Sequence, residues 1–296
     1  MALNIAVFRK RLGTAIVFVA VMLAGLLWNQ WSFFILFSVI HMGCWIEYQK
    51  IITRISPEYS EITGFHKYGI ILAGFCVMLY LTNDTFNIGD FSLHAMGFWL
   101  GLITIFLLPL VELLFSKQLS SKNILYSFGG LIYISLAWAL MIGLYEKYRP
   151  ADGIVGPNIP LTIILAVWIN DTMAYLVGSF IGKTPFSKIS PKKTWEGTLG
   201  GAILCVVVIG LVANGPGSVI LGIPQGTGIA AYHWYIIAAI VAVMGTAGDL
   251  FESKLKRMAD IKDSGQIMPG HGGFLDRFDS LLFVTPIVWI YVQLFM

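Results

Sequence analysis

Long apolar runs separated by short polar segments set the pattern of this chain. A transmembrane helix needs about 20 predominantly apolar residues. Runs that reach or approach this length are found at about 12–28, 31–48, 68–82, 95–115, 124–145, 159–181, 198–213, 233–250 and 279–295. The third, seventh and ninth are short, and tilted or partly interfacial helices are the alternative for them. The pattern predicts an all-α, polytopic integral membrane protein with about nine transmembrane helices.

Composition supports this class. Hydrophobic residues make up 57% of the 296 residues and charged residues only 12%, whereas about a quarter of a soluble domain is charged. A membrane β-barrel would alternate apolar and polar residues, and these runs do not. The three cysteines, Cys44, Cys76 and Cys205, all lie inside apolar runs. Their placement indicates small core residues and not a disulfide framework or a metal site.

The positions of the basic residues predict an orientation. With the N-terminus in the cytoplasm, seventeen of the 19 Lys and Arg residues fall in cytoplasmic segments, and only Lys147 and Arg149 fall outside. Cytoplasmic loops carry an excess of Lys and Arg, so we expect a cytoplasmic N-terminus and an external C-terminus. Arg9–Arg11 precede the first run as in a signal peptide, but no clear cleavage site follows, and we expect a retained span. We expect one continuous membrane domain, with an N-terminal multi-span region over 1–122 and a C-terminal region over 123–296 that carries the chemistry.

One predicted cytoplasmic segment, 182–197, is rich in lysine and hydroxyl side chains. It reads GKTPFSKISPKKTWEG. Lysine ammonium groups, hydroxyls and loop amides can all bind phosphate oxygens. The candidate phosphate ligands are Ser190, Lys192, Lys193 and Thr194. The alternative is a plain positively charged anchor at the membrane surface.

A second segment, 253–279, places many charges beside apolar spans. Its 269–273 run, PGHGG, is unsuited to an ordinary helix, because Pro lacks a donor and Gly is conformationally free. Charged groups beside spans are costly and usually functional, and this combination suits a metal-bound polyphosphate. The candidate phosphate ligands here are Lys256, Arg257, Lys262, His271 and Arg277.

Two carboxylates frame this second segment. Asp249 ends the eighth run and Asp276 precedes the ninth. Such carboxylates can hold Mg²⁺ while leaving positions open for phosphate oxygens. Asp260 and Asp263 have another reading, as solvated charges or as partners of Lys256 and Lys262. His271 has two readings as well, either a metal or phosphate ligand or a structural hydrogen-bonding residue.

Several other polar residues lie within or at the ends of apolar runs. Asp171 lies deep in the sixth run, where an ionised carboxylate is expensive unless it faces a polar cavity or a cation; an interhelical hydrogen bond is the alternative. Ala174, Gly178 and Gly182 recur every four residues and allow close helix packing.

The remaining polar residues in the apolar runs are not predicted to belong to the site. Glu47 and Glu112 are expected at the membrane interface, since each lies near the predicted cytoplasmic end of a run. His41 is expected to be a packed hydrogen-bonding residue and not a ligand.

These motifs resemble a known family. Ser253-x-Leu255-Lys256-Arg257-x4-Lys262-Asp263-x-Gly265, followed by Pro269-x-His271-Gly272-Gly273-Phe274-x-Asp276-Arg277-Phe278-Asp279, resembles the signature of the CDP-diacylglycerol synthases, or phosphatidate cytidylyltransferases. Met268 stands where that pattern usually has Leu, Ile or Phe. Asp171-x2-Ala174-Tyr175 and the stretch 190–197 are similar to a second block of the same family. The matched motifs cover roughly 170–280, and the N-terminal half matches only in its multi-span character.

The resemblance implies a reaction. CTP and phosphatidate would give CDP-diacylglycerol and pyrophosphate with Mg²⁺, and a monovalent cation such as K⁺ could assist. It implies Asp249 and Asp276 as metal ligands, and Lys192, Lys193, Lys256 and Arg257 as candidates for the CTP phosphates. The catalytic candidates are Asp249, Asp276, Lys193 and Asp171. The expected partners are CTP, phosphatidic acid, the lipid bilayer and a second copy of the chain, with no nucleic acid. We expect the inner or plasma membrane of the cell, with the active site facing the cytoplasm.

Two other functions compete with this interpretation. An ion-coupled transporter of an anionic solute would explain Asp171 and the glycine-rich break before the ninth run. It would not explain why acidic and basic groups crowd onto one predicted cytoplasmic rim, and the chain has no convincing internal repeat. A related CTP-using enzyme acting on a polyprenol or an ether lipid is the closer alternative.

Overall fold

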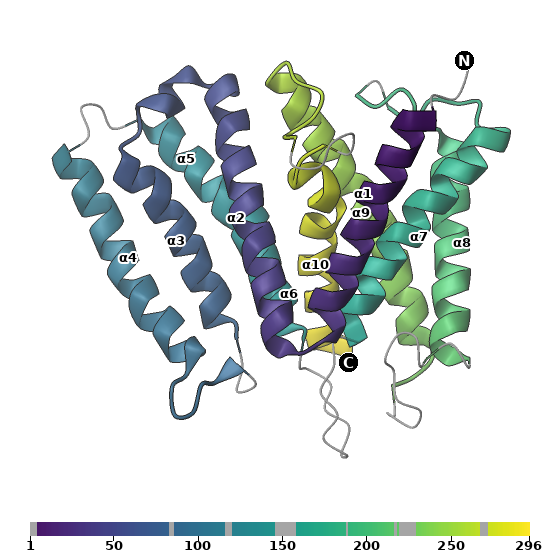
Figure 1. The fold of residues 1–296 in the computed structure, drawn as a ribbon, viewed down its shortest axis with the longest axis horizontal. Helices are drawn as coiled ribbons and strands as arrows, with labels where there is room; N and C mark the ends of the chain where they lie inside the picture. Colours follow the sequence, from purple (N-terminus) through teal and green to yellow (C-terminus); the bar gives the residue numbers. More distant parts are fainter. Residues whose placement is uncertain are drawn as a thin grey trace. The chain divides into compact units, whose positions relative to one another are not determined.

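The chain folds into α-helices joined by short loops (Figure 1). The structure is a computed structural model, and it describes residues 5–82, 86–115, 120–145, 158–187, 189–215, 218, 229–266 and 272–296. Within these residues, extended pairing is limited to two isolated bridges, Ile88 with Phe91 and Pro185 with Thr194. The predicted all-α class is confirmed.

Seven helices of the described chain are long and apolar enough to cross a membrane. They are Gln30–Ile55, Leu93–Phe115, Ser121–Gly143, Asn158–Ile181, Trp195–Asn214, Tyr232–Met258 and Leu275–Phe295. Two shorter apolar helices cover Gly13–Leu27 and Gly64–Tyr80. The prediction of a polytopic membrane protein is therefore confirmed. The count of nine spans, the orientation of the termini and the division into 1–122 and 123–296 stay predictions.

The chain divides into two compact units, of which the first comprises Met1–Ile142 and Leu255–Phe278. Its helices are α1 (Ile5–Leu27), α2 (Gln30–Ile55), η1 (Pro57–Glu61), α3 (Gly64–Tyr80), α4 (Leu93–Phe115), α5 (Ser121–Gly130), η3 (Leu131–Leu136, a π-helical segment) and α6 (Ala137–Gly143). Asn29 separates α1 from α2 because its side chain caps α2: Oδ1 accepts from the Ser32 amide at 2.8 Å. The Ser32 hydroxyl in turn accepts from the Asn29 amide at 3.1 Å, which completes a capping box.

A buried polar cluster ties α2 to the π-helical segment. The Ser135 hydroxyl lies 3.0 Å from His41 Nε2 and accepts from Trp45 Nε1 at 2.8 Å. Gly74 of α3 packs so closely on Ser135 that a Cβ there would collide with its hydroxyl. His41 is thus a packed hydrogen-bonding residue, as expected from the sequence.

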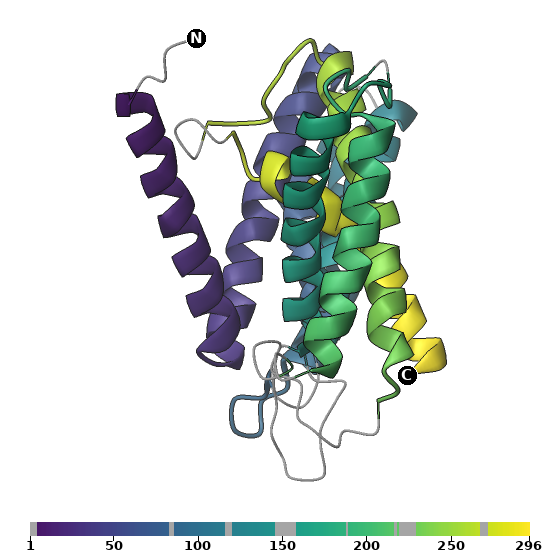
Figure 2. The ribbon, with the colours of Figure 1, turned by 90° about the vertical axis from the view of Figure 1, so that its right-hand side faces the viewer.

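The second unit comprises Gly143–Lys254 and Asp279–Met296. It contains α7 (Asn158–Ile181) and α8 (Trp195–Asn214), together with α9 (Tyr232–Met258) as far as Lys254 and α10 (Leu275–Phe295) from Asp279. Helices α7 and α8 lie side by side (Figure 2). Small residues permit this contact, because a Cβ on Gly197 would lie 2.7 Å from the Ala174 carbonyl oxygen and 2.9 Å from Gly178 Cα. The small face predicted at Ala174 and Gly178 is therefore confirmed as a packing surface.

Candidate functional site

A polar cavity of about 510 Å³ lies within the second unit. Helix α7 contributes Asp171 among other residues, and α9 contributes Thr246 and Asp249. The loop between α7 and α8 contributes Ser190, Lys192, Lys193 and Thr194. Six of the predicted site residues thus line one cavity. Asp171 and Asp249 bring carboxylates, and the loop brings ammonium and hydroxyl groups.

The loop between α7 and α8 is held in place by contacts at the start of α8. Thr194 caps this helix, and its hydroxyl accepts from the Gly197 amide at 3.2 Å. The backbone pairs across the loop, with the Phe186 amide donating to the Lys193 carbonyl at 2.7 Å. Phe186 also packs against Trp195 with the two rings tilted, and the ring centroids are 4.4 Å apart. The loop therefore presents its lysines from a fixed backbone.

Glu196 fixes two of the first residues of the same loop, Lys183 and Thr184. Its carboxylate accepts from the Lys183 amide at 3.1 Å, from the Thr184 amide at 3.1 Å and from the Thr184 hydroxyl at 2.8 Å. An acidic residue in the first turn of a helix is also favoured by the helix dipole. Glu196 thus has a structural role, whereas Lys192 and Lys193 line the cavity.

Lys193 and Asp249 form an ion pair in this cavity, and each side chain is 30% exposed. The pair joins the loop to α9. Both residues were predicted from the sequence, Lys193 as a phosphate ligand and Asp249 as a metal ligand. Their contact shows that the loop and the eighth predicted span meet at one point.

Asp276 lies in the first unit, near the start of α10, and it is largely buried. Its Oδ1 accepts from Lys256 Nζ at 2.6 Å, and the two side chains are 9% and 14% exposed respectively. Its Oδ2 accepts from the Ser264 and Gly273 amides, both at 2.8 Å. Lys256 therefore pairs with Asp276, and the sequence alternative of an Asp260 partner is not what the structure shows.

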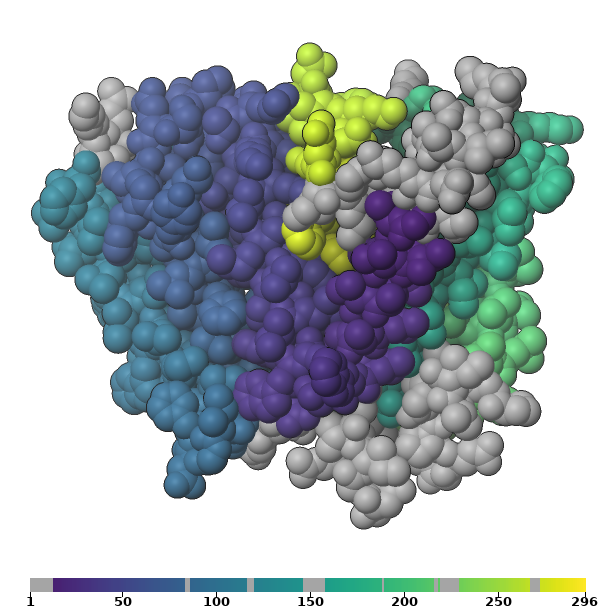
Figure 3. Space-filling model, viewed as in Figure 1, coloured from purple at the N-terminus to yellow at the C-terminus, as the bar shows by residue number. Residues whose placement is uncertain are grey.

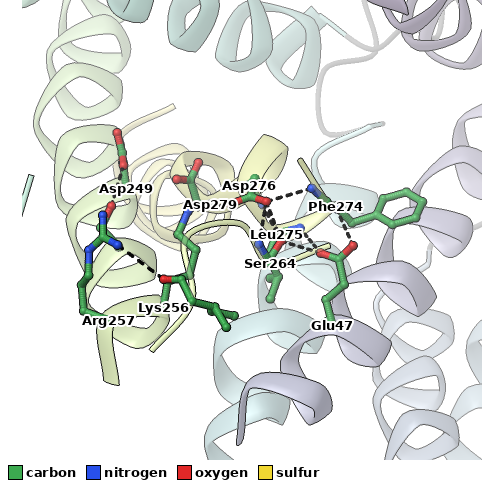
Figure 4. A network of polar contacts seen from close by, with 12 residues as sticks. Glu47, Asp249, Lys256, Arg257, Ser264, Phe274, Leu275, Asp276 and Asp279 are labelled. Atoms are coloured by element: carbon green, nitrogen blue, oxygen red, sulfur yellow. Dashed lines mark hydrogen bonds and ion pairs between the residues drawn. The ribbon is translucent and has the colours of Figure 1, made fainter. Parts of the chain in front are cut away.

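Glu47, on α2, accepts hydrogen bonds from the residues next to Asp276 (Figure 4). It accepts from the Phe274 and Leu275 amides at 2.9 Å each, and from the Ser264 hydroxyl at 2.7 Å. These amides are among the unpaired donors at the start of α10, which a carboxylate satisfies well. Gly273 packs so tightly on Glu47 that a Cβ there would collide with the carboxylate. Glu47 therefore holds the segment that leads into Asp276.

Glu47 and Glu112 are both buried within the protein, and their expected place at the membrane interface stays a prediction. Glu47 is 5% exposed and Glu112 is 9% exposed. Glu112 accepts from the Thr63 hydroxyl at 2.6 Å, and it lies 3.4 Å from His66 Nδ1. A carboxylate near the end of an apolar run gives no sign of partners far along the chain, which is why the sequence did not reveal the role of Glu47.

The other predicted site residues have varied placements. Arg257 is exposed and its guanidinium lies 3.5 Å from the Ile261 carbonyl, a weak contact. Lys262 is exposed, and Arg277 is exposed at the edge of an apolar groove. His271 lies outside the described residues. The predicted convergence of Lys193 and Arg257 on one nucleotide stays a prediction.

Comparison with known proteins identifies the chain's relatives. The model of the cytidylyltransferase family matches residues 9–295. The chain belongs to the cytidylyltransferase family. The match covers both units, including the N-terminal half for which the sequence motifs were silent.

Individual relatives carry a more specific name. This cytidylyltransferase-family chain is 38% identical over 193 residues to a phosphatidate cytidylyltransferase of Bacillus subtilis, covering 62% of the chain and 66% of that protein. It is 36% identical over 166 residues to one of Thermotoga maritima, covering 54% of the chain and 56% of that protein. For one of Aquifex aeolicus, the identity is 40% over 131 residues, 44% of the chain and 45% of the relative. The chain thus matches two thirds or less of the length of these relatives.

Proposed function

We propose that this chain is a phosphatidate cytidylyltransferase, which makes CDP-diacylglycerol and pyrophosphate from CTP and phosphatidate. The observation that carries the proposal is the polar cavity of the second unit, where Lys193 pairs with Asp249 beside Lys192, Ser190, Thr194 and Asp171. Membership of the cytidylyltransferase family and the names of its relatives support the choice of substrates.

The main demand of the reaction is to stabilise negative charge on the two substrates and on the leaving pyrophosphate, and a strong general base is not required. A phosphate oxygen of phosphatidate attacks the α-phosphorus of CTP, the bond from that phosphorus to the bridging oxygen breaks, and pyrophosphate leaves with the electron pair. The attacking phosphate monoester has a second pKa of about 6, so it is largely ionised near neutral pH. Cationic groups that bring the two anions together and stabilise the leaving pyrophosphate supply the catalysis.

The residues of the cavity suit these tasks. Lys193 and Lys192 can bind phosphate oxygens as point charges, and the hydroxyls of Ser190 and Thr194 can donate to them. The fixed backbone of the loop keeps these groups oriented before substrate arrives. If a phosphate oxygen replaced Asp249 as the partner of Lys193, the Asp249 carboxylate would be left for a cation to bind.

The donor set also fits Mg²⁺. Within the described residues, no group of three or more His, Cys, Asp or Glu side chains could hold a metal ion. Mg²⁺ does not need such a cage, since it is usually bound by one or two carboxylates, waters and substrate phosphates. Asp249, with Asp171 lining the same cavity, would hold it there, and bound Mg²⁺ would neutralise phosphate charge. The role of Asp276 as a further metal ligand, and that of a monovalent cation, belong to the same proposal.

The membrane setting follows from the lipid substrate. A diacyl lipid reaches an enzyme made of apolar helices without leaving the bilayer, whereas CTP comes from the cytoplasm. We therefore propose an enzyme of the inner or plasma membrane, with its nucleotide site on the cytoplasmic side. A homodimer is proposed on the family resemblance alone.

A lipid panel tests the proposal. Detergent-purified protein is given labelled CTP and Mg²⁺ with diacyl phosphatidate, an ether-linked phosphatidate or a polyprenol in turn. We expect CDP-diacylglycerol only from the diacyl substrate, and dependence on Mg²⁺. Efficient use of the ether lipid or the polyprenol in its place would assign a different substrate, and no CTP consumption with any lipid would favour a transporter.

A further inference from the structure

An apolar groove of about 440 Å³ runs between α1 and α2 in the first unit. The two helices meet at their shared turn and diverge away from it, as Figures 1 and 3 show. Val17 and Val21 line the groove from α1, and Leu36 and Val39 line it from α2. Its volume lies within the range of about 300–1,000 Å³ that is typical of small-molecule sites.

The groove ends at the segment that carries Asp276. Gly273, Phe274, Arg277 and Phe278 complete its lining. Phe274 is seated against Gly43 of α2, where a Cβ would collide with the ring. Phe278 packs on Phe18 of α1, with ring centroids 6.0 Å apart. The groove is thus lined in part by the segment whose backbone donates to Glu47, and Arg277 is an exposed cation among its lining residues.

A second apolar groove of the same unit provides a comparison. It measures about 560 Å³ and lies among α3, α4 and the α5–η3 helix, and none of the residues that line it is charged. Both grooves offer apolar surface to a lipid tail. The α1–α2 groove also has a cation at its edge, and Arg can bind a phosphate through two parallel hydrogen bonds.

We propose that one acyl chain of phosphatidate lies in the α1–α2 groove, with its phosphate group at Arg277. The proposal rests on the proposed function, since it assigns the lipid of that reaction to a place in the first unit. It makes the residues along the groove determinants of acyl-chain length, while Arg277 recognises the anionic head group.

Gly13 provides a direct test, because it lines the groove and a Cβ added there meets no other atom within 4 Å. Gly13→Phe should therefore fill the groove without displacing the fold. We expect the KM for dioleoyl phosphatidate to rise about tenfold, equivalent to roughly 1.4 kcal/mol of lost apolar contact. The KM for CTP and the rate with dihexanoyl phosphatidate should stay near wild type, because a short chain does not need the groove.

Gly101→Phe is the matched control. Gly101 lines the second groove, and an added Cβ there makes only an ordinary contact, 3.6 Å from Cys76 Cβ. We expect unchanged kinetics with both lipids. A Gly13→Phe variant that uses dioleoyl phosphatidate like wild type would overturn the proposal, and so would equal losses with the long and the short substrate.

A binding experiment separates this proposal from the proposed function, because it does not need turnover. Phosphatidate with a photoreactive group in its acyl chain is cross-linked to the wild-type protein, and the labelled peptides are mapped. We expect labels within 13–22 and 36–40 that excess unlabelled phosphatidate removes and phosphatidylcholine does not. Labels spread over 97–109 to the same degree would reject the groove, whether or not the protein proves active with CTP.

Discussion

Glu47 and Asp276 share one hydrogen-bonding neighbour, the hydroxyl of Ser264, although they lie on helices at opposite ends of the sequence. Ser264 Oγ is 2.7 Å from Glu47 Oε2 and 2.9 Å from Asp276 Oδ2. A hydroxyl has one proton to donate, so it serves one carboxylate at a time. Glu47 also accepts from the Phe274 and Leu275 amides, so a buried residue of α2 about 230 positions away helps to fix the position of Asp276.

Glu47→Gln tests this dependence. An amide has a single acceptor oxygen and would turn an N–H toward backbone donors that Glu47 now satisfies. We expect turnover to fall at least about tenfold, in keeping with the roughly 1.5–3 kcal/mol of a hydrogen bond to a charged group. The Mg²⁺ concentration for half-maximal activity should rise, since Asp276 would no longer be held in place.

Glu112→Gln is the control for this variant, because Glu112 is a buried carboxylate of the same unit with partners elsewhere. It should leave the Mg²⁺ dependence unchanged even if the melting temperature falls. An equal loss of thermal stability in both variants, with no change in Mg²⁺ dependence for either, would limit Glu47 to a structural role.

The two aspartates give the second prediction. Asp249→Asn and Asp276→Asn should each lower turnover at least about a hundredfold while the protein still inserts, because each removes negative charge that Mg²⁺ requires. Activity is measured across a Mg²⁺ titration. Near-normal activity of Asp276→Asn over that range would show that the Asp276 carboxylate is not a Mg²⁺ ligand and only binds Lys256 and Ser264.

Lys193 gives the third prediction. Lys193→Ala should raise the KM for CTP much more than the KM for phosphatidate, because the ammonium is proposed to bind the triphosphate. Lys193→Arg should restore only part of the loss, since a planar guanidinium does not replace a compact ammonium. Lys183→Ala is the control: it lies in the same loop, but its side chain is exposed and does not line the cavity. An unchanged CTP dependence in well-inserted Lys193→Ala would remove the loop from the nucleotide site.

Topology gives the fourth prediction. The segments 183–197 and 253–278 should face the cytoplasm, because of the distribution of Lys and Arg. Single cysteines at Lys192 and Asp263 suit the labelling experiment, since both side chains are exposed whereas Ser264 is buried. The native Cys44, Cys76 and Cys205 are all buried. We expect no labelling by an impermeant reagent in intact cells and ready labelling after permeabilisation. Labelling of intact cells from outside would show the opposite orientation.

Hydrophobic run length predicted the helices well, because a span must satisfy its backbone within itself. The run at 159–181 became Asn158–Ile181, and that at 95–115 became Leu93–Phe115. The eighth run was placed at 233–250, but α9 continues to Met258. The extra two turns are charged, so apolar length could not reveal them, although Lys256 owes its position to them.

The candidate site was predictable where charge stood out against apolar sequence. Lys193 and Asp249 were both chosen on that ground, and the structure adds that they touch. Contacts made by uncharged or distant groups were not predictable. Nothing in the apolar run around Glu47 indicates that its partners are the amides of Phe274 and Leu275, because that pairing depends on how the first unit folds.

The central claim, cytidylyl transfer to a lipid, is tested most directly by where the label goes. Purified protein is incubated with Mg²⁺, diacyl phosphatidate and CTP radiolabelled at either the α- or the γ-phosphate, and the lipid fraction is counted. We predict label in the lipid from α-labelled CTP and none from γ-labelled CTP, with the γ-label recovered as pyrophosphate. Transfer of the γ-label to the lipid would show a kinase, and no transfer of either label would contradict the account.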